Sequence, residues 1–289
     1  MNRRKKRILW VAACVLLLFS AAWLSGLLIS GVQVRQEPLL VDNLEQFRQF
    51  DIAAEQFWKL EPWTEDSSKK LAVSFLYNGG KIKKEDQLCH ALSWYSLLMP
   101  EETIKGYEKV FHTLLADAVY FPVAQDRTGR AKVQYGDSWG GRRTYGGDRR
   151  HEGTDLMSSN KERGYFPIVS VSDGVVEKKG WLNLGGYRLG IRAPNGAYFY
   201  YAHLDHYADG MEEGMTVKAG ELIGFMGDSG YGEEGTVGKF DVHLHFGVYL
   251  DIEKKETSVN PYQLLRYLEK KPQIPFERVP EGVHTDANV

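Results

Sequence analysis

Cysteine is scarce in this sequence, with only Cys14 and Cys89 among 289 residues. Two thiols cannot form the disulfide framework that stabilises small secreted scaffolds, so that class of protein is excluded. A strong excess of either charge is also missing, because 36 basic residues face 38 acidic ones. We therefore expect no binding of nucleic acid through overall charge. A hydrophobic content of 43% excludes a mostly disordered chain.

The balanced charge hides an asymmetry at the N-terminus. Positions 3–7 hold five consecutive cations, and residues 8–34, which follow directly, contain no charged side chain. When these five are set aside, 36 minus 5 basic residues face 38 acidic ones, so the rest of the chain carries about −7. A modestly acidic chain of this kind would not be held on an anionic surface by overall charge.

Residues 8–34 are long enough to cross a hydrocarbon core, which takes about 20 apolar residues as a helix. The cations before them favour a cytoplasmic N-terminus, which places residues 35–289 outside the cytoplasm. The alternatives are a buried helix of a soluble core and a signal peptide cleaved near residues 20–22, but the apolar run continues beyond those small residues. We expect a single-pass membrane protein whose cytoplasmic tip and anchor span residues 1–34.

Residues 35–120 contain few glycines and show apolar spacing near 3.6, which predicts an α-helical segment. A second helix is expected to break at residues 78–80, and a third to run from Pro100 to about Ala116. The segment is a candidate for binding a protein partner, for spacing or for autoinhibition. The first expected helix is a single one that carries the apolar residues Leu44, Phe47, Phe50, Phe57 and Leu60.

Three residues of the helical segment have side chains that can bind metals or act in catalysis. His90 and His112 each stand alone among apolar neighbours, and Cys89 adjoins His90. Isolated residues of these types are more often buried structural side chains than ligands or nucleophiles. We interpret all three as structural.

From residue 121 the chain changes to short β-rich runs separated by glycine-containing turns. No alternation of strands with helices occurs there, so a mainly β, antiparallel domain is predicted over residues 121–270, followed by a C-terminal tail over 271–289. The clearest expected strands are residues 168–171, 187–191, 197–201 and 242–246.

One of these strands carries a His-x-His pair. Side chains alternate between the two faces of a strand, so His243 and His245 lie on one face and the apolar residues between and beside them on the other. Such a strand packs an apolar face on the core and offers two imidazoles to the opposite side. Taken alone, the pair is weak evidence for a metal site.

Two other short motifs also offer suitable side chains. His151 and Asp155 supply an imidazole and a carboxylate, both good zinc ligands. Their spacing invites comparison with a helical zinc motif, but Gly153 and the glycines at 146–147 make a helix poor here. The third motif, at residues 201–206, places His203 at the end of an aromatic strand.

Together the three motifs resemble the M23 (lysostaphin/LytM-type) zinc peptidases. The resemblance rests on His-x-Gly-x-Asp at 151–155, Tyr-Ala-His-Leu at 201–204 and His-Leu-His-Phe-Gly at 243–247, and it covers roughly residues 121–265. It implies an antiparallel β-sheet with a groove, similar to a duplicated hybrid motif. The helical segment takes no part in the resemblance.

Carried over to this sequence, the resemblance implies that His151, Asp155 and His245 ligate one Zn²⁺. His203 and His243 would then be catalytic residues that face the metal-activated water and the substrate, with their separate roles left open. Two imidazoles and one carboxylate leave such a site net positive, with an open position. A purely structural zinc site would usually have four protein ligands, often cysteines, and neither cysteine lies in the β domain.

The function that the resemblance implies is an extracytoplasmic zinc endopeptidase that hydrolyses peptide bonds in bacterial peptidoglycan. The alternative is a non-catalytic or regulatory scaffold with the same fold, docking a cell-envelope or sporulation partner. Relatives of the second kind often lack one or more ligands, whereas all five residues are present here.

Other residues near the motifs allow further predictions. Arg143 and Tyr145 are candidates for binding substrate, and Trp139 for lining the groove. Asp205 and His206 are interpreted as solvated turn residues, with modulation of His203 or contact with substrate as the alternative. Residues 231–241 form an insertion relative to the family's usual short loop, which leaves the shape of the groove wall beside His243 open.

Overall fold

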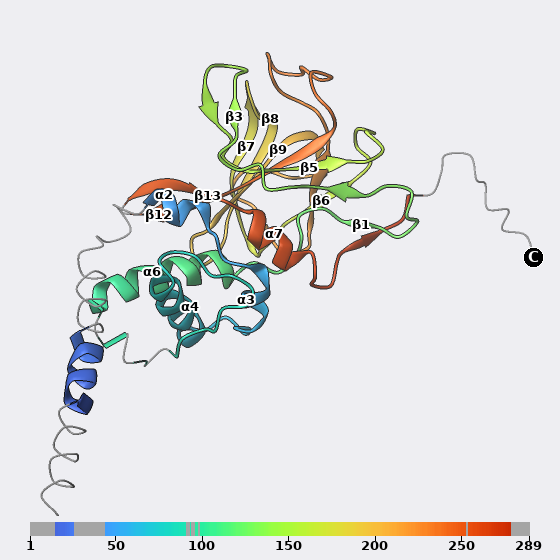
Figure 1. Ribbon diagram of the computed structural model, residues 1–289. Helices are drawn as coiled ribbons and strands as arrows, with labels where there is room; N and C mark the ends of the chain where they lie inside the picture. Colours follow the sequence, from blue (N-terminus) through green and yellow to red (C-terminus); the bar gives the residue numbers. More distant parts are fainter. Residues whose placement is uncertain are drawn as a thin grey trace, which may run out of the picture.

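A helical layer packs against a large β-sheet in the computed structural model of this chain (Figure 1). The structure describes residues 15–25, 44–90, 93, 96–97, 99–252 and 254–278. The helices are α2 (Leu44–Gln49), α3 (Ala54–Trp58), α4 (Glu65–Tyr77), α6 (Glu101–Leu115) and α7 (Tyr262–Leu268).

The end of one helix and both ends of another lie where the sequence indicates. Thr64 forms a capping box with Ser67 at the start of α4, and the helix ends at Asn78, directly before two glycines. Helix α6 follows Pro100, and its C-cap is Ala116. The predictions for these helices are confirmed.

The prediction of one helix through residues 44–60 is wrong. Phe50 has a φ of 48°, and Ile52 forms a β-bridge with Ile82, so the chain is not helical between α2 and α3. The apolar residues nevertheless reach the same core, because both short helices pack against it. Their spacing therefore matched one helix although two are present.

The main sheet is antiparallel, as the glycine-punctuated pattern indicates. Its central path runs β10-β7-β8-β9-β12-β5-β2; β13 pairs with β12, and β11 pairs with β6 and β9. The strands are β2 (Val133–Gln134), β5 (Thr154–Ser158), β6 (Pro167–Val169), β7 (Gly174–Leu182), β8 (Gly186–Arg192), β9 (Tyr198–Tyr207), β10 (Thr216–Val217), β11 (Leu222–Met226), β12 (His243–Ile252) and β13 (Lys255–Val259).

Two small sheets accompany the main one. Strands β3 (Arg142–Arg143) and β4 (Arg149–Arg150) form an antiparallel hairpin just before His151. Strand β1 (Gln125–Asp126) pairs in parallel with β14 (Pro275–Phe276), which lies in the expected C-terminal tail. The start of that tail is thus joined to the β region.

The helices and the sheet share one hydrophobic core. On the helical side it contains a cluster of aromatic rings, in which Phe111 lies 5.4 Å from Phe75 and 5.9 Å from Phe47 between ring centroids. The same cluster of buried side chains continues to Leu244 and Phe246 on the inner face of β12. The change at residue 121 is therefore a change of secondary structure within one continuous core.

Of the membrane anchor expected over residues 8–34, the structure describes only residues 15–25, which are helical with exposed side chains. The remainder of the expected anchor lies outside the described residues. Among the parts of the chain that are described, no helix has both the length and the apolar character needed to span a bilayer. The anchor stays a prediction.

Candidate metal centre and groove

Three neighbouring strands bring the separate motifs together. In the antiparallel pairing of β5 with β12, Asp155 lies opposite His245. In the pairing of β12 with β9, His245 lies opposite Ala202, directly before His203. His151 precedes β5, so its imidazole reaches the same place from the connecting segment.

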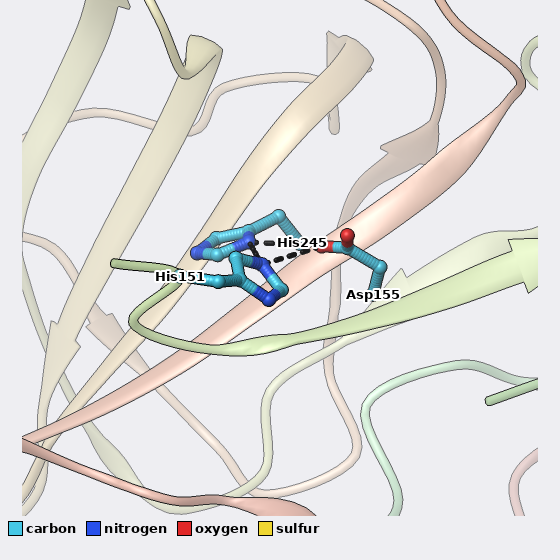
Figure 2. Close-up of side chains that lie close together, drawn as sticks. All are labelled: His151, Asp155 and His245. Atoms are coloured by element: carbon cyan, nitrogen blue, oxygen red, sulfur yellow. Dashed lines mark hydrogen bonds and ion pairs between the residues drawn. The ribbon is translucent and has the colours of Figure 1, made fainter. Parts of the chain in front are cut away.

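The donor atoms of the three expected ligands converge on one point (Figure 2). Nε2 of His151 lies 3.0 Å from Oδ1 of Asp155 and 3.0 Å from Nδ1 of His245. Nδ1 of His245 lies 3.0 Å from the same carboxylate oxygen. The three atoms thus form a nearly equilateral triangle.

This donor set fits a metal ion. Two imidazole nitrogens at 3.0 Å from each other would repel through their lone pairs unless a proton or a cation lay between them. Donor atoms bonded to one Zn²⁺ at about 2.0–2.2 Å lie about 3 to 3.5 Å apart, which is the spacing found here. His151, Asp155 and His245 are therefore the residues that can hold a metal, as predicted.

The ligand side chains are oriented by further contacts. Nδ1 of His151 donates to the carbonyl of Ser138 at 3.0 Å, which leaves Nε2 free for a metal. Arg143 donates to Oδ2 of Asp155 at 2.6 Å. Burial opposes ionisation of Asp155, but the close polar contacts with His151 and His245 outweigh it and hold the pKa of this carboxyl well below its usual range.

Arg143, a candidate for binding substrate, contacts an expected metal ligand. It lines the groove, but its guanidinium is engaged with an expected metal ligand. No sequence pattern pairs Arg143 with Asp155, because the turn of the β3–β4 hairpin and His151 lie between them in the chain. Binding of substrate by Arg143 stays a prediction.

Gly153 has a steric role in the first motif. A Cβ at this position would lie 2.5 Å from Cε1 of His245 and 2.7 Å from the carbonyl oxygen of Phe246. The imidazole of His245 therefore packs directly over the backbone of Gly153. The glycine between the two ligands is required by space.

His203 and His243 lie beside the metal ligands, with their rings 4.7 Å apart between centroids. Nδ1 of His203 donates to the carbonyl of Ser229 and Nδ1 of His243 to that of Asp241, both at 2.7 Å. In the neutral state each ring therefore keeps an unprotonated Nε2. Nε2 of His243 is 3.7 Å from Oδ1 of Asp155.

The backbone of His203 is strained. Its φ of 61° lies in the left-handed region, which a bulky side chain adopts rarely and mostly at functional sites. Burial and the neighbouring His243 and His245 hold the pKa of His203 well below its ordinary value. No sequence pattern indicates this conformation.

The insertion at residues 231–241 forms an aromatic wall beside the histidines. The ring centroid of Phe240 lies 4.5 Å from His203 and 5.1 Å from His243, and Tyr231 packs on Phe240. Tyr145 stacks on Tyr231 at 4.2 Å and donates to its carbonyl. Tyr145 is thus part of this wall, and its contact with substrate stays a prediction.

The five residues open onto a groove of about 840 Å³. Among the described residues, those that line it all come from 143–256, and none from the helical segment. The described part of that segment therefore does not block the groove, which leaves the autoinhibitory interpretation without a structural basis there.

Two predictions about neighbouring residues differ from the structure. Trp139 is wrong as a groove residue, because it is 8% exposed, contacts the guanidinium groups of Arg48 and Arg150 with its ring, and is not among the residues that line the groove. The prediction that Asp205 and His206 are turn residues is wrong, because both belong to strand β9. His206 is exposed and bonds to Asp205, and neither residue lines the groove.

Sequence reasoning missed the contact between the helical segment and the metal motif. Arg48 in α2 donates to Glu152 at 2.6 Å and to the carbonyl and hydroxyl oxygens of Ser258. Glu45 accepts hydrogen bonds from both Arg48 and Arg150. Helix α2 is thereby fastened to the residues on both sides of His151.

The comparisons with known proteins agree with this site. A family model described as Peptidase family M23 matches residues 149–261. The L-Ala--D-Glu endopeptidase of Bacillus subtilis (strain 168) is 45% identical over 141 residues, which are 49% of this chain and 42% of that protein. The glycyl-glycine endopeptidase ALE-1 of Staphylococcus capitis is 30% identical over 102 residues, 35% of this chain and 26% of that protein. The chain thus spans less than half the length of these two relatives.

A solved structure from Ruminococcus gnavus, described as a glycyl-glycine endopeptidase, shares 39% sequence identity and a TM-score of 0.65. The similarity covers 81% of this chain and 93% of that one. Residues 121–289 alone could not supply so large a share of this chain. The similarity therefore extends into the helical segment, which the sequence motifs had left outside the resemblance.

Proposed function

Because this chain belongs to peptidase family M23, we propose that it is a zinc endopeptidase that hydrolyses peptide bonds in bacterial peptidoglycan. The observation that carries the proposal is the triangle of donor atoms from His151, Asp155 and His245, with two further histidines beside it. The names of the relatives support peptide-bond cleavage, and that of the Bacillus subtilis protein supports an L-Ala–D-Glu bond.

Zn²⁺ held by these three residues would supply a Lewis acid for the peptide carbonyl and lower the pKa of a water molecule towards about 7. His203 and His243 supply the proton transfers. Each has its Nδ1 fixed on a backbone carbonyl, so its Nε2 is aimed and free to take a proton, and then to donate it to the leaving amine or to a developing oxyanion.

The surrounding residues hold these groups in place and restrict water. Arg143 fixes the carboxylate of Asp155, and the wall of Tyr231 and Phe240 covers one side of the imidazoles. Preorganised groups in a partly dry groove stabilise developing charge better than solvent does. The groove has a volume of about 840 Å³, which is several times the volume of a single side chain.

We also propose that the chain acts outside the cytoplasm, held near the wall by residues 8–34. The cations at 3–7 and the uncharged run after them support this topology. No feature of the described groove favours the alternative of a non-catalytic scaffold, because every residue that the chemistry needs is present and converges.

The test is digestion of purified peptidoglycan by the full chain, followed by mass spectrometry of the muropeptides. We expect new amino termini that disappear with a chelator and with His245→Ala. His206→Ala, which changes an exposed histidine outside the groove, is the matched control and should retain activity. A zinc-loaded protein that cleaves no wall preparation would overturn the proposal.

A further inference from the structure

Arg188 is a cation of the groove for which the described part of the chain supplies no ion pair. It lies in the middle of β8, lines the groove, and is not fully exposed. Its Nη1 atom is buried and has no hydrogen-bond partner among the described residues. Removing part of a guanidinium from water without a compensating partner costs free energy, so such a group is expected to have a ligand.

The acidic side chains of the groove do not neutralise Arg188. Each already has a cationic partner, in the pairs Glu152 with Arg48, Asp155 with Arg143, and Glu256 with Arg192. A free anion entering the groove would therefore find Arg188 unoccupied. The planar fork of a guanidinium matches a carboxylate, to which it can donate two parallel hydrogen bonds.

The sheet register places Arg188 in line with the metal centre. Its neighbours Tyr187 and Leu189 pair with Leu204 and Tyr201, and the register shifts between these pairs, so Arg188 stands beside Ala202 and His203. Ala202 in turn lies opposite His245. Strands lie about 4.8 Å apart, so the backbones of Arg188 and His245 are about 10 Å apart across two strand spacings.

This separation sets where a bound carboxylate would lie along a substrate. An extended peptide advances about 3.3–3.6 Å per residue, and the arginine side chain spans part of the distance towards the centre. A carboxylate held by Arg188 therefore belongs to a residue one or two positions from the bond at the metal centre.

Three tyrosines are among the neutral side chains that line the groove. They are Tyr198, Tyr200 and Tyr249, with Tyr249 about equally distant from the other two rings, at 6.1 and 6.2 Å. Burial raises the pKa of Tyr198 to about 12 and those of the other two higher still. Phenols that stay protonated do not repel an anion, and they offer flat surfaces to a peptide.

We propose that Arg188 binds a free carboxylate of the substrate peptide, one or two residues from the bond to be cut, and so selects peptides with that carboxylate over amidated ones. The inference rests on the proposed function and deepens it. It assigns to β8 a specificity residue that none of the three sequence motifs contains.

Two synthetic peptides test this directly with the zinc-loaded full chain. Both contain L-Ala joined to D-Glu that continues through its side-chain carboxyl, and they differ only in a free or amidated α-carboxyl. We expect kcat/KM to favour the free acid by about 10- to 100-fold, the range of a charge-assisted hydrogen-bonded pair. Arg188→Met should bring the ratio near one while cleavage of the amide changes little, and Arg188→Lys should restore part of it.

Arg142→Met is the matched control, because Arg142 pairs with the exposed Asp148 and is not among the residues that line the groove. It should leave the ratio between the two peptides unchanged, which separates local binding from a general effect of positive charge. Equal cleavage of both peptides by the wild type would overturn the inference. An equal loss on both peptides in Arg188→Met would also overturn it.

A protein that cleaves neither peptide would count against the proposed function, and binding then decides the inference. Titration calorimetry with the same two peptides should show tighter binding of the free acid, by about tenfold or more, in the wild type and not in Arg188→Met. Equal affinities, or no binding of either peptide, would overturn the assignment of Arg188.

Discussion

Arg143 and Asp155 form an ion pair in which the guanidinium donates to Oδ2 at 2.6 Å. Oδ1 of the same carboxylate faces His151 and His245 at 3.0 Å. The two oxygens therefore have separate tasks: one is held by the arginine and the other is left for a metal. This division keeps the carboxylate in one orientation.

We expect Arg143→Met to lower the affinity for Zn²⁺ by about 10- to 100-fold, the usual cost of removing a partner that orients a ligand. The measurement is competition against a chelator of known affinity. Arg142→Met is the control, because Arg142 is the adjacent residue and pairs with the exposed Asp148. Tighter zinc binding in Arg143→Met would show that charge repulsion outweighs orientation.

Gly153→Ala should displace His245, because the added Cβ meets the imidazole at 2.5 Å and the backbone of Phe246 at 2.7 Å. Overpacking of this kind costs about 1–3 kcal/mol of unfolding free energy, and here it also moves a ligand. Zinc content and urea unfolding are the measurements. Gly136→Ala is the control, since a Cβ there meets no atom within 4 Å. Equal behaviour of the two variants would contradict the steric role.

The variant His203→Asn separates the contribution of the imidazole to catalysis from the cost of the left-handed backbone at this position. Asparagine tolerates the left-handed conformation better than other non-glycine residues, whereas alanine does not. Both Asn and Ala should lower kcat by about 10²- to 10⁴-fold, the contribution of a general acid or base. Only His203→Ala should lose about 1 kcal/mol of stability relative to Asn. Activity retained by His203→Asn would exclude a role in proton transfer.

Asp126 makes stability depend on pH. Burial disfavours its charged form, but hydrogen bonds from Thr128, Tyr165 and the backbone of Ala131 outweigh it and hold the pKa of Asp126 well below its usual range. The folded pKa lies below the unfolded value of about 3.9, so the carboxylate stabilises the fold above that pH. This contribution is lost as the pH falls through the folded pKa.

Asp126→Asn should therefore cost about 1–3 kcal/mol of unfolding free energy at pH 7, because an amide group would face donors. The difference from wild type should shrink as the pH falls from about 4 towards 2. Urea unfolding across this range measures it. A difference that stays constant with pH would assign the effect to packing alone.

Arg48→Met tests whether helix α2 holds the metal motif. The variant loses hydrogen bonds to Glu152 and Ser258 and the contact with Trp139, so we expect a loss of about 1–3 kcal/mol of stability. Lys70→Met removes a surface pair with Asp66 and should cost less than about 0.5 kcal/mol. Chemical unfolding compares the two, and similar small losses would show that α2 is only peripheral.

Local patterns predicted local features well. Alternation along residues 242–248 places His243 and His245 on one face of β12, because a strand imposes a period of two. The proline at 100 and the glycines at 79–80 marked helix ends for the same reason: they act on the backbone of their own segment. The single helix expected over 44–60 failed, because two short helices on one core produce the same apolar spacing.

Features that depend on distant pairing were beyond local patterns. Three arginines carry no periodic or motif signal in the sequence and resemble ordinary surface cations. They are Arg143, which pairs with Asp155, Arg48, which pairs with Glu152, and Arg188, which has no ion-pair partner among the described residues. The ring of Trp139 predicts a place in the groove, whereas in the structure it packs against the guanidinium groups of Arg48 and Arg150. Only the packing of α2 and the β-strands distinguishes these residues from ordinary solvated arginines.

By itself the sequence determined the types of the ligands, their order along the chain and the faces of the strands that carry them, because these follow from short-range backbone geometry. Tertiary structure alone decided that His151 and His245, 94 residues apart, meet at 3.0 Å. It also decided which arginines hold the site, with Arg143 on Asp155 and Arg48 on Glu152. Those outcomes depend on the register between β5, β12, β9 and β8, and long-range register is set by the packing of the whole sheet on its core.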